Sequence, residues 1–167
     1  MIQVILKYGM LLNLIAAVVI IGSQFFNARL WLDCYPESIR NAVKSQTKKE
    51  KRNKLIPGLP FLVSLFLFPY LAGSDVYHIM PGVNYVFLKV FFAAFGVGFI
   101  FNLYDLLILD WLIFCYITPK YQIIKGSEHL LKEYKNYKFH FISFLKGLLY
   151  AVIYSLTVAF FVVYILN

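Results

Sequence analysis

The feature that most constrains this chain is a series of four long apolar runs separated by polar, basic segments. A transmembrane helix needs about 20 predominantly apolar residues, and several of the runs approach that length. Hydrophobic residues make up 61% of the 167 residues and charged residues only 14%, against about 25% charged residues in soluble proteins. The sequence therefore predicts an all-α integral membrane protein, a four-transmembrane-helix bundle that forms one domain over residues 1–167. The expected spans are about 9–28, 55–73, 85–111 and 141–166.

The basic residues concentrate in two of the polar segments. Of the 16 Lys and Arg, eight lie between Arg29 and Lys54 and five between Lys120 and Lys138. Such residues gather on the cytoplasmic side of membrane proteins. We therefore expect a multi-pass protein of the cell membrane with cytoplasmic segments at about 29–54 and 112–140 and with both termini outside. The basic segments carry no nucleic-acid recognition motif and adjoin membrane spans, so nucleic acid is not an expected partner.

The densest basic block is KKEKRNK, from Lys48 to Lys54. A block of this kind lies against anionic lipid headgroups, with each basic residue contributing about 1 kcal/mol. The expected partners are therefore the lipid bilayer and its anionic headgroups. Beyond that contact, the segment is interpreted as a solvated loop that sets the topology.

The third apolar run, residues 84–118, is the longest. As one helix it would measure about 52 Å, against about 30 Å of hydrocarbon in a bilayer. A hairpin of two spans is the alternative, but it would place the lysines of the next segment outside, and the run has no central turn signal. We predict one tilted helix that projects into the cytoplasm until Thr118-Pro119 ends it. The fourth helix is also expected to be long, beginning near Ser127 and running unbroken into the last span.

The inner half of the third run reads FNLYDLLILDW and contains polar groups that are costly inside a membrane. Asn102 and Asp105 lie one turn apart on one helix face and form a candidate ion or proton site. Asp105 can bind a cation, carry a proton, or be a neutral structural group, with Lys146 as a candidate partner. Asp110, beside Trp111, marks the membrane interface, and in an α-helix it points about 140° away from Asp105.

A second candidate site depends on where the last helix begins. If it begins near Ser127, then His129, Glu133, Asn136 and His140 fall on one stripe. Packing of the third helix against this stripe would create a site for a divalent metal. Its ligands would be Asp105, Asp110, His129, Glu133 and His140. A solvated helix face explains the same residues, and no cofactor is predicted apart from this possible metal.

Small residues recur at every fourth position of the last run, and the third run repeats the spacing at Ala94, Gly98 and Asn102. Small residues let membrane helices approach closely. The pattern predicts either an antiparallel pair of the third and fourth helices or a seam between two copies of the chain. The residues of the last run are Ser143, Gly147, Ala151, Ser155 and Ala159.

The remaining sequence offers little evidence of catalysis. Cys34 and Cys115 fit neither a metal-ligand spacing nor a disulfide framework and are expected to be free thiols. HExxH, Gly-rich phosphate-loop and paired-aspartate motifs are missing. The leading interpretation is a non-enzymatic transport-related or accessory (scaffold) subunit that packs with copies of itself or with a larger membrane complex. The alternative is a membrane-embedded, metal-assisted enzyme that acts on a lipid headgroup at the cytoplasmic face.

Overall fold

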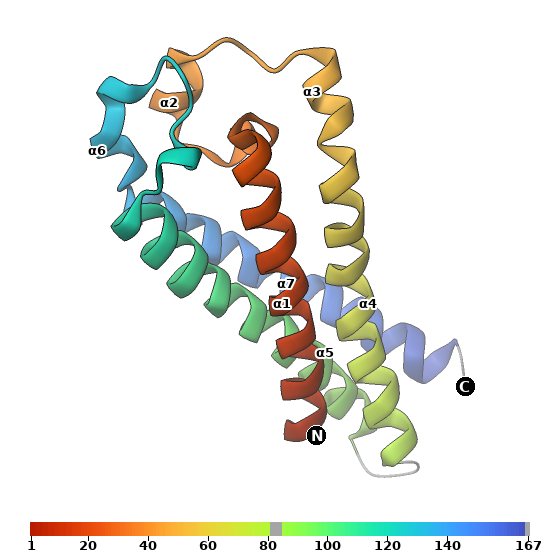
Figure 1. Cartoon of the computed structure of the whole chain (residues 1–167). Helices are drawn as coiled ribbons and strands as arrows, with labels where there is room; N and C mark the ends of the chain where they lie inside the picture. Colours follow the sequence, from red (N-terminus) through yellow and green to blue (C-terminus); the bar gives the residue numbers. More distant parts are fainter. Residues whose placement is uncertain (81–84, 166–167) are drawn as a thin grey trace.

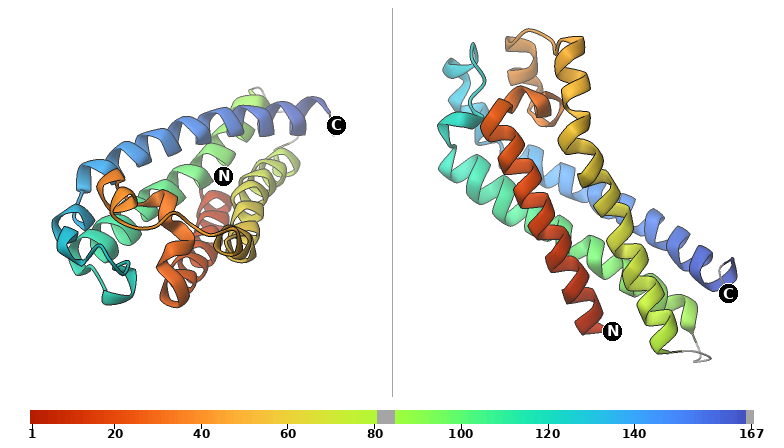
Figure 2. Two further views of the ribbon diagram at one scale, coloured as in Figure 1. Left: turned by 90° about the horizontal axis from the view of Figure 1, so that it is seen from above. Right: turned by 45° about the vertical axis from the view of Figure 1, so that its right-hand side comes forward.

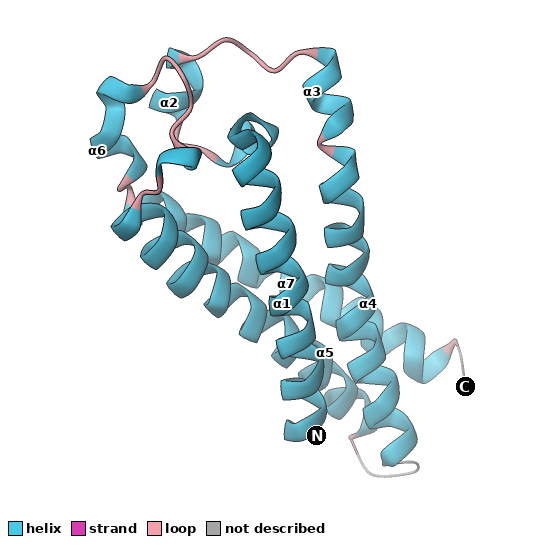
Figure 3. Cartoon of the chain, in the orientation of Figure 1, coloured by secondary structure: helices cyan, strands magenta, loops and turns pink. Residues whose placement is uncertain are grey.

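The computed structural model describes residues 1–80 and 85–165, and within these residues the chain forms only helices and loops (Figure 3). Four helices are long and apolar enough to cross a membrane, so the chain is an all-α membrane bundle, as predicted. They are α1 (Ile2–Asn27) with its extension η1 (Ala28–Cys34), α4 (Leu55–Ile79), α5 (Val86–Tyr104) with its extension η2 (Asp105–Ile117), and α7 (Tyr137–Tyr164). Residues 81–84 of the predicted outer loop, the predicted span end at 166 and the C-terminus lie outside the described residues.

The four long helices share one end at which the connecting segments gather (Figure 1). Among the described residues, three short α-helices lie there: α2 (Glu37–Ala42), α3 (Lys48–Asn53) and α6 (Leu131–Tyr134). We call this end, formed by residues 28–54 and 118–136, the loop end; the N-terminus lies at the opposite end (Figure 1). The two basic segments of the sequence therefore lie at the same end of the bundle.

Helix α5 is the central element of the bundle, because it packs against α1, α4 and α7 (Figure 2). One buried cluster lies between α1, α4 and α5 and includes Leu12, Ala72 and Val97. Another lies between α5 and α7 and includes Val90 and Val158. Many large apolar side chains elsewhere on the four helices are exposed, as expected where a bundle faces lipid rather than water.

Small residues allow α5 and α7 to approach closely. A Cβ atom added at Gly98 would lie 3.2 Å from the Cβ of Ala151, and one added at Gly147 would overlap the Oδ1 atom of Asn102. Ala94, Ser155 and Ala159 are fully or nearly fully buried, whereas Ser143 is exposed. The small residues from Gly147 to Ala159 thus lie in an antiparallel contact within the chain, and Ser143 lies outside it.

The third apolar run is one continuous helical stretch, as predicted. Its helix continues from α5 into η2 and ends at Thr118, whose backbone is left-handed with φ 48°. Such a φ is unusual for a β-branched residue, and Pro119 follows directly. The predicted Thr118-Pro119 end is therefore correct, although Thr118 itself turns the chain.

The helices that carry the first two predicted spans extend beyond the predicted span limits. Helix α1 begins at Ile2 rather than near residue 9, and it breaks at Asn27, where the backbone is extended and the side chain accepts a hydrogen bond from the Arg29 N–H. Helix α4 continues beyond Gly73 to Ile79. This extension carries Asp75, which accepts a hydrogen bond from the Tyr8 hydroxyl at 2.8 Å.

The predicted unbroken fourth helix is wrong. After Ser127 the chain forms the short helix η4 (Glu128–Leu130) and then α6, and it leaves helical geometry at Lys135 and Asn136. The Asn136 side chain accepts the Phe139 N–H at 3.0 Å and so caps α7. Ser127 is not the expected cap, because its buried hydroxyl donates to the Ile124 carbonyl.

The loop end has a small hydrophobic core of its own instead of two separate solvated loops. Tyr35 and Tyr134, from different connecting segments, meet edge to face with ring centroids 5.7 Å apart, and Ile39 is fully buried beside them. Ion pairs at 2.6 Å between Arg29 and Glu50 and at 2.9 Å between Lys54 and Asp33 hold α3 against η1. The connecting segments therefore form a folded cap over the ends of the long helices.

Candidate functional site

The segment η2 is a π-helix thirteen residues long. In a π-helix each N–H bonds to the carbonyl five residues earlier, and the Thr118 N–H closes the segment in this way on the Ile113 carbonyl at 3.0 Å. Most π-helical segments are single turns, and they occur frequently at functional sites. A π-helix of this length within a membrane span marks η2 as the part of the bundle to examine for function.

The π-helical geometry changes the relation between the two aspartates. In an α-helix, residues five apart point about 140° away from each other. In a π-helix, residues five apart lie about one turn apart on the same side. Asp105 and Asp110 accordingly interact electrostatically with each other, and Asp105 also interacts with His140. The 140° separation expected from the sequence applies to a regular α-helix, and the π-helical geometry of η2 departs from that condition.

Helix α7 supplies the partner of Asp110. The Nδ1 atom of His140 lies 3.0 Å from Oδ1 of Asp110, with the two side chains only 10% and 14% exposed. His140 is in the first turn of α7, where the helix dipole favours a nearby negative charge such as the Asp110 carboxylate. We call Asp105, Asp110 and His140 the acid–base cluster. Its three side chains can accept and release protons inside the span region of the bundle.

Asn102 belongs to the helix contact more than to this cluster. Its side-chain N–H donates to the Gly98 carbonyl at 2.8 Å, and its Oδ1 atom faces Gly147. Within residues 1–80 and 85–165, no hydrogen bond joins Asn102 to Asp105 and no ion pair joins Lys146 to Asp105; Lys146 is exposed. Asp105 therefore makes no direct polar contact with the residues expected from the sequence, and the neighbouring charges that act on it are those of Asp110 and His140.

The structure does not bring the five proposed metal ligands together. His129 is exposed, and Glu133 accepts a hydrogen bond from the Ser38 hydroxyl at 2.8 Å. The break before α7 separates both from the helix that carries His140. In the described part of the chain, no group of three or more His, Cys, Asp or Glu side chains could hold a metal ion. Only the aspartates and His140 of the proposed set are neighbours.

A polar cavity of about 50 Å³ adjoins the acid–base cluster at the loop end. Two buried glutamines line it, and the Oε1 atoms of Gln24 and Gln122 have no hydrogen-bond partner within the described residues. Tyr35 donates its hydroxyl hydrogen to the Gln122 carbonyl at 3.1 Å. Burial raises the pKa of Tyr35 above its ordinary value, so this hydroxyl stays protonated as a donor. The cavity is lined by Gln24, Cys34, Tyr35, Pro36, Asp110, Phe114, Gln122, Tyr134 and His140.

The sequence patterns pointed to Asp110 and His140 but not to Gln24, Gln122 and Tyr134 of this cavity. Gln24 carried a usable signal, since a glutamine near the inner end of an apolar run needs a polar environment. Gln122 and Tyr134 carried no such signal, because they lie in a lysine-rich segment where polar residues are common. Their burial depends on the folding of the two connecting segments against each other.

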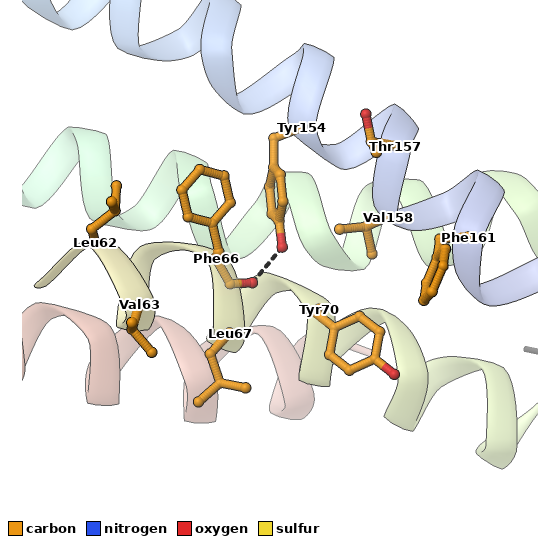
Figure 4. A pocket seen from close by; sticks show the side chains of 9 residues that line it. All are labelled: Leu62, Val63, Phe66, Leu67, Tyr70, Tyr154, Thr157, Val158 and Phe161. Carbon is orange, nitrogen blue, oxygen red and sulfur yellow. Dashed lines mark hydrogen bonds between the residues drawn. The ribbon is translucent and has the colours of Figure 1, made fainter. Parts of the chain in front are cut away.

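A second cavity lies between α4 and α7 and has a different character. It is an apolar groove of about 490 Å³ between residues of the two spans, such as Leu62, Tyr70 and Phe161 (Figure 4). The Tyr154 hydroxyl donates to the Phe66 carbonyl across this groove (Figure 4). Phe66 directly follows Leu65, whose carbonyl lacks a helical hydrogen bond because Pro69 has no N–H to donate to it. Neighbouring side chains commonly satisfy backbone groups in such membrane helices, and the groove therefore has a structural explanation.

Comparison of the chain with protein-family models, with curated proteins and with solved structures finds no match. The fold and the site alone therefore define its class. The chain is a small membrane protein whose described residues form four helices long and apolar enough to span a membrane, with a buried acid–base cluster next to a polar cavity.

Proposed function

We propose that this chain is a transport-related membrane protein in which Asp105, Asp110 and His140 carry a proton. The observation that supports the proposal most strongly is the 3.0 Å contact between Asp110 and His140 in a largely buried part of the bundle. Ionisable side chains within membrane spans are rare, and chains of Asp, Glu and His there form the proton relays of pumps and transporters. The candidate proton site predicted around Asp105 is thereby extended to include Asp110 and His140.

The chemistry of the cluster suits proton transfer. Histidine changes charge near neutral pH, and a hydrogen bond to a carboxylate provides a direct route for its proton. Asp105 adds a second carboxyl group whose charge acts on both partners. A proton received by one of the three groups changes the electrostatic environment of the other two, and such coupling allows a relay to release a proton as well as bind it.

The long π-helix supports this proposal independently of the charges. A regular α-helix would direct Asp105 and Asp110 to different sides, and only one of them could face α7. The π-helical stretch brings both aspartates to the side of His140. Because π-helical segments are uncommon and are found frequently at functional sites, the geometry favours a role for the pair beyond the packing of two helices.

The proposed sidedness follows the charge distribution. The loop end holds twelve of the sixteen Lys and Arg residues, and positive charge favours the cytoplasmic side. We propose that the loop end faces the cytoplasm and that the acid–base cluster is the proton-binding site nearer to that side.

Proton flux into liposomes tests the proposal. Purified protein is reconstituted in liposomes that contain a pH-sensitive dye, and a potassium diffusion potential drives protons across the membrane. We expect flux with the wild-type protein and a fall to the level of protein-free liposomes with Asp105→Asn or Asp110→Asn. His129→Ala, a change at an exposed histidine of the same loop end, is the matched control and should retain the flux.

Two results would contradict the proposal. One is wild-type protein that adds no proton flux to the liposomes, which would favour the accessory or scaffold role. The other is wild-type flux that persists in both aspartate variants. Each variant is first checked for its helical content and for a single species in detergent, so that loss of flux is not confused with loss of fold.

A further inference from the structure

We infer that the polar cavity is the water-filled port through which protons pass between the loop-end surface and the acid–base cluster. The inference rests on the proposed function and adds to it the ligand, which is water, and the two side chains that hold it, Gln24 and Gln122. Two amide oxygens with unmet hydrogen bonds, both in side chains more than nine-tenths buried, point to this ligand.

The size and polarity of the cavity suit water. A single water needs about 10–15 Å³ of accessible space, so the cavity of about 50 Å³ has room for about three. A buried water also needs two to four polar partners. Acceptors are in excess here, because Gln24 Oε1 and Gln122 Oε1 lack donors and the Asp110 carboxylate uses Oδ1 for His140. Water and the hydrated proton supply the missing donors.

The position of the cavity supports the role of a port. Asp110 and His140 form part of its wall, so water inside it touches the acid–base cluster directly. Cys34 also lines the cavity and is exposed, which places it where the cavity meets the surface. Gln24 comes from α1, whereas Gln122 comes from η3 (Lys120–Gln122), so the port forms only when the cap is folded against the helices.

The other groups of the cavity wall are neutral hydrogen-bonding partners. Tyr35 donates to the Gln122 carbonyl at 3.1 Å, and the Tyr134 hydroxyl accepts the Ile124 N–H at 2.9 Å. Both tyrosines are thus already bonded to the backbone and hold the shape of the cavity. Among the lining side chains, the acidic or basic groups are Asp110 and His140, with the Cys34 thiol at the mouth.

Hydroxyl-radical footprinting tests the presence of water without depending on transport. Radicals generated from water label side chains next to that water, and the rings of Tyr35 and Tyr134 are only 6% and 2% exposed. We expect Tyr134 to be labelled above Tyr8, a tyrosine outside the cavity that is 7% exposed against 2% for Tyr134. The double variant Gln24→Leu/Gln122→Leu should lower the labelling of Tyr134 to that of Tyr8. Labelling of Tyr134 no stronger than that of Tyr8 in the wild type would overturn the inference, because the cavity would be dry.

Proton flux of the same double variant then tests the role of the port. We expect flux to fall by about tenfold, the change that about 1.4 kcal/mol in a barrier produces. Thermal stability should change little, because leucine is close to glutamine in size and the direct side-chain hydrogen bond that is lost, from Gln122 Nε2 to the Phe114 carbonyl, is long at 3.4 Å. The single change Gln3→Leu, at an exposed glutamine of α1, is the matched control and should alter neither quantity.

The results of these experiments distinguish a failure of the proposed port from a failure of the proposed function. Unchanged flux in the double variant, together with lost flux in Asp110→Asn, would overturn the port and leave the acid–base cluster as the proton site. Absent flux in the wild type would overturn the proposed function and the port role together. A loss of stability in the double variant that matches the loss of flux would assign the glutamines a structural role, against the inference.

Discussion

At the scale of single residues, the contact between Asp110 and His140 is the interaction on which the account depends. It joins a π-helical segment of one span to the first turn of another, and both side chains are largely shielded from solvent. Removing one partner of a buried polar pair leaves the other partner buried without a hydrogen bond. This lowers the free energy of unfolding more than removing both partners does. The pair should therefore contribute to stability as well as to proton binding.

The change His140→Ala should lower the free energy of unfolding by about 1.5–3 kcal/mol, the range for a hydrogen bond to a charged group. The physical reason is the Asp110 carboxylate, which would keep its burial and lose its partner. Reversible unfolding in bicelles measures the effect. The exposed His129 provides the control, since His129→Ala should change stability by no more than about 0.5 kcal/mol. Equal losses in the two variants would show that the pair makes no special contribution.

At the scale of elements, small residues in α5 and α7 determine how closely the two helices pack. Gly98 lies against Ala151, and Gly147 lies against Asn102, so backbone and side chain fill the contact without space for larger groups. In a membrane the packing of such surfaces drives helix association, because lipid is as apolar as the side chains. The spacing of the contact also sets the register that places His140 opposite Asp110.

The change Gly147→Leu should destabilise the bundle by about 1–3 kcal/mol, as overpacking of a filled contact does. Ser143→Leu introduces the same side chain one turn away at an exposed position and should have little effect. Asn102→Ala should reduce the cost of Gly147→Leu, because it removes the atom that the new side chain meets. Thermal unfolding of the wild type, the three single variants and the double variant Asn102→Ala/Gly147→Leu measures both the cost and the coupling. If the cost is the same with and without Asn102→Ala, the two residues are not in contact.

The sequence predicted which long helices form better than it predicted where those helices break or change geometry. Hydrophobic run length identified four spans, and the absence of a turn signal in the third run predicted one helix, as the structure has it. The break at Asn27 and the break before Tyr137 were missed, because an asparagine that binds its own backbone can end a helix within an otherwise favourable sequence. The π-helical geometry of η2 was also missed, because residue spacing alone cannot distinguish it from an α-helix.

The site could be predicted only in part for the same reasons. Asp105, Asp110 and His140 were all candidates because ionisable residues near membrane spans are conspicuous in a sequence. Their arrangement was not predictable, since it depends on the π-helical turn of Asp110 toward α7 and on a shorter α7 that excludes His129 and Glu133. Gln24 and Gln122 meet only through tertiary packing at the loop end.

At the scale of the whole molecule, the two ends of the bundle differ in charge and in structure. The loop end carries a folded cap, the acid–base cluster and most of the basic residues. Its acidic residues Asp33 and Glu50 are paired with Lys54 and Arg29, which leaves Lys48, Lys49, Lys51 and Arg52 of α3 exposed. We expect this end to lie against anionic lipid at the cytoplasmic surface.

Replacing these four exposed basic residues by Gln should weaken association with anionic lipid by about 1 kcal/mol per residue. Exchange of spin-labelled anionic lipid around the reconstituted protein measures the preference, which should also decrease as salt is added. Lys7→Gln with Lys89→Gln, at the opposite half of the bundle, is the control. An anionic-lipid preference that survives the replacement of all four residues would exclude α3 as the contact.

Cysteine labelling tests the orientation of the molecule. Cys34 is exposed at the loop end and Cys115 is buried. A membrane-impermeant thiol reagent applied outside intact cells should label neither, and after permeabilisation it should label Cys34 alone. Labelling of Cys34 in intact cells would place the loop end outside and reverse the proposed topology.

If the acid–base cluster holds an exchangeable proton within the bundle, pH-difference infrared spectroscopy of the reconstituted protein detects that proton directly. We expect the carbonyl-stretch band of a protonated carboxylic acid, with an intensity that changes with pH. The band should be absent from the double variant Asp105→Asn/Asp110→Asn. In His140→Ala the band should remain, but its pH dependence should change. His129→Ala should leave the band as it is in the wild type. A band that is unaltered by the Asp105→Asn/Asp110→Asn change, or a wild-type protein without any pH-dependent carboxyl band, would contradict the account.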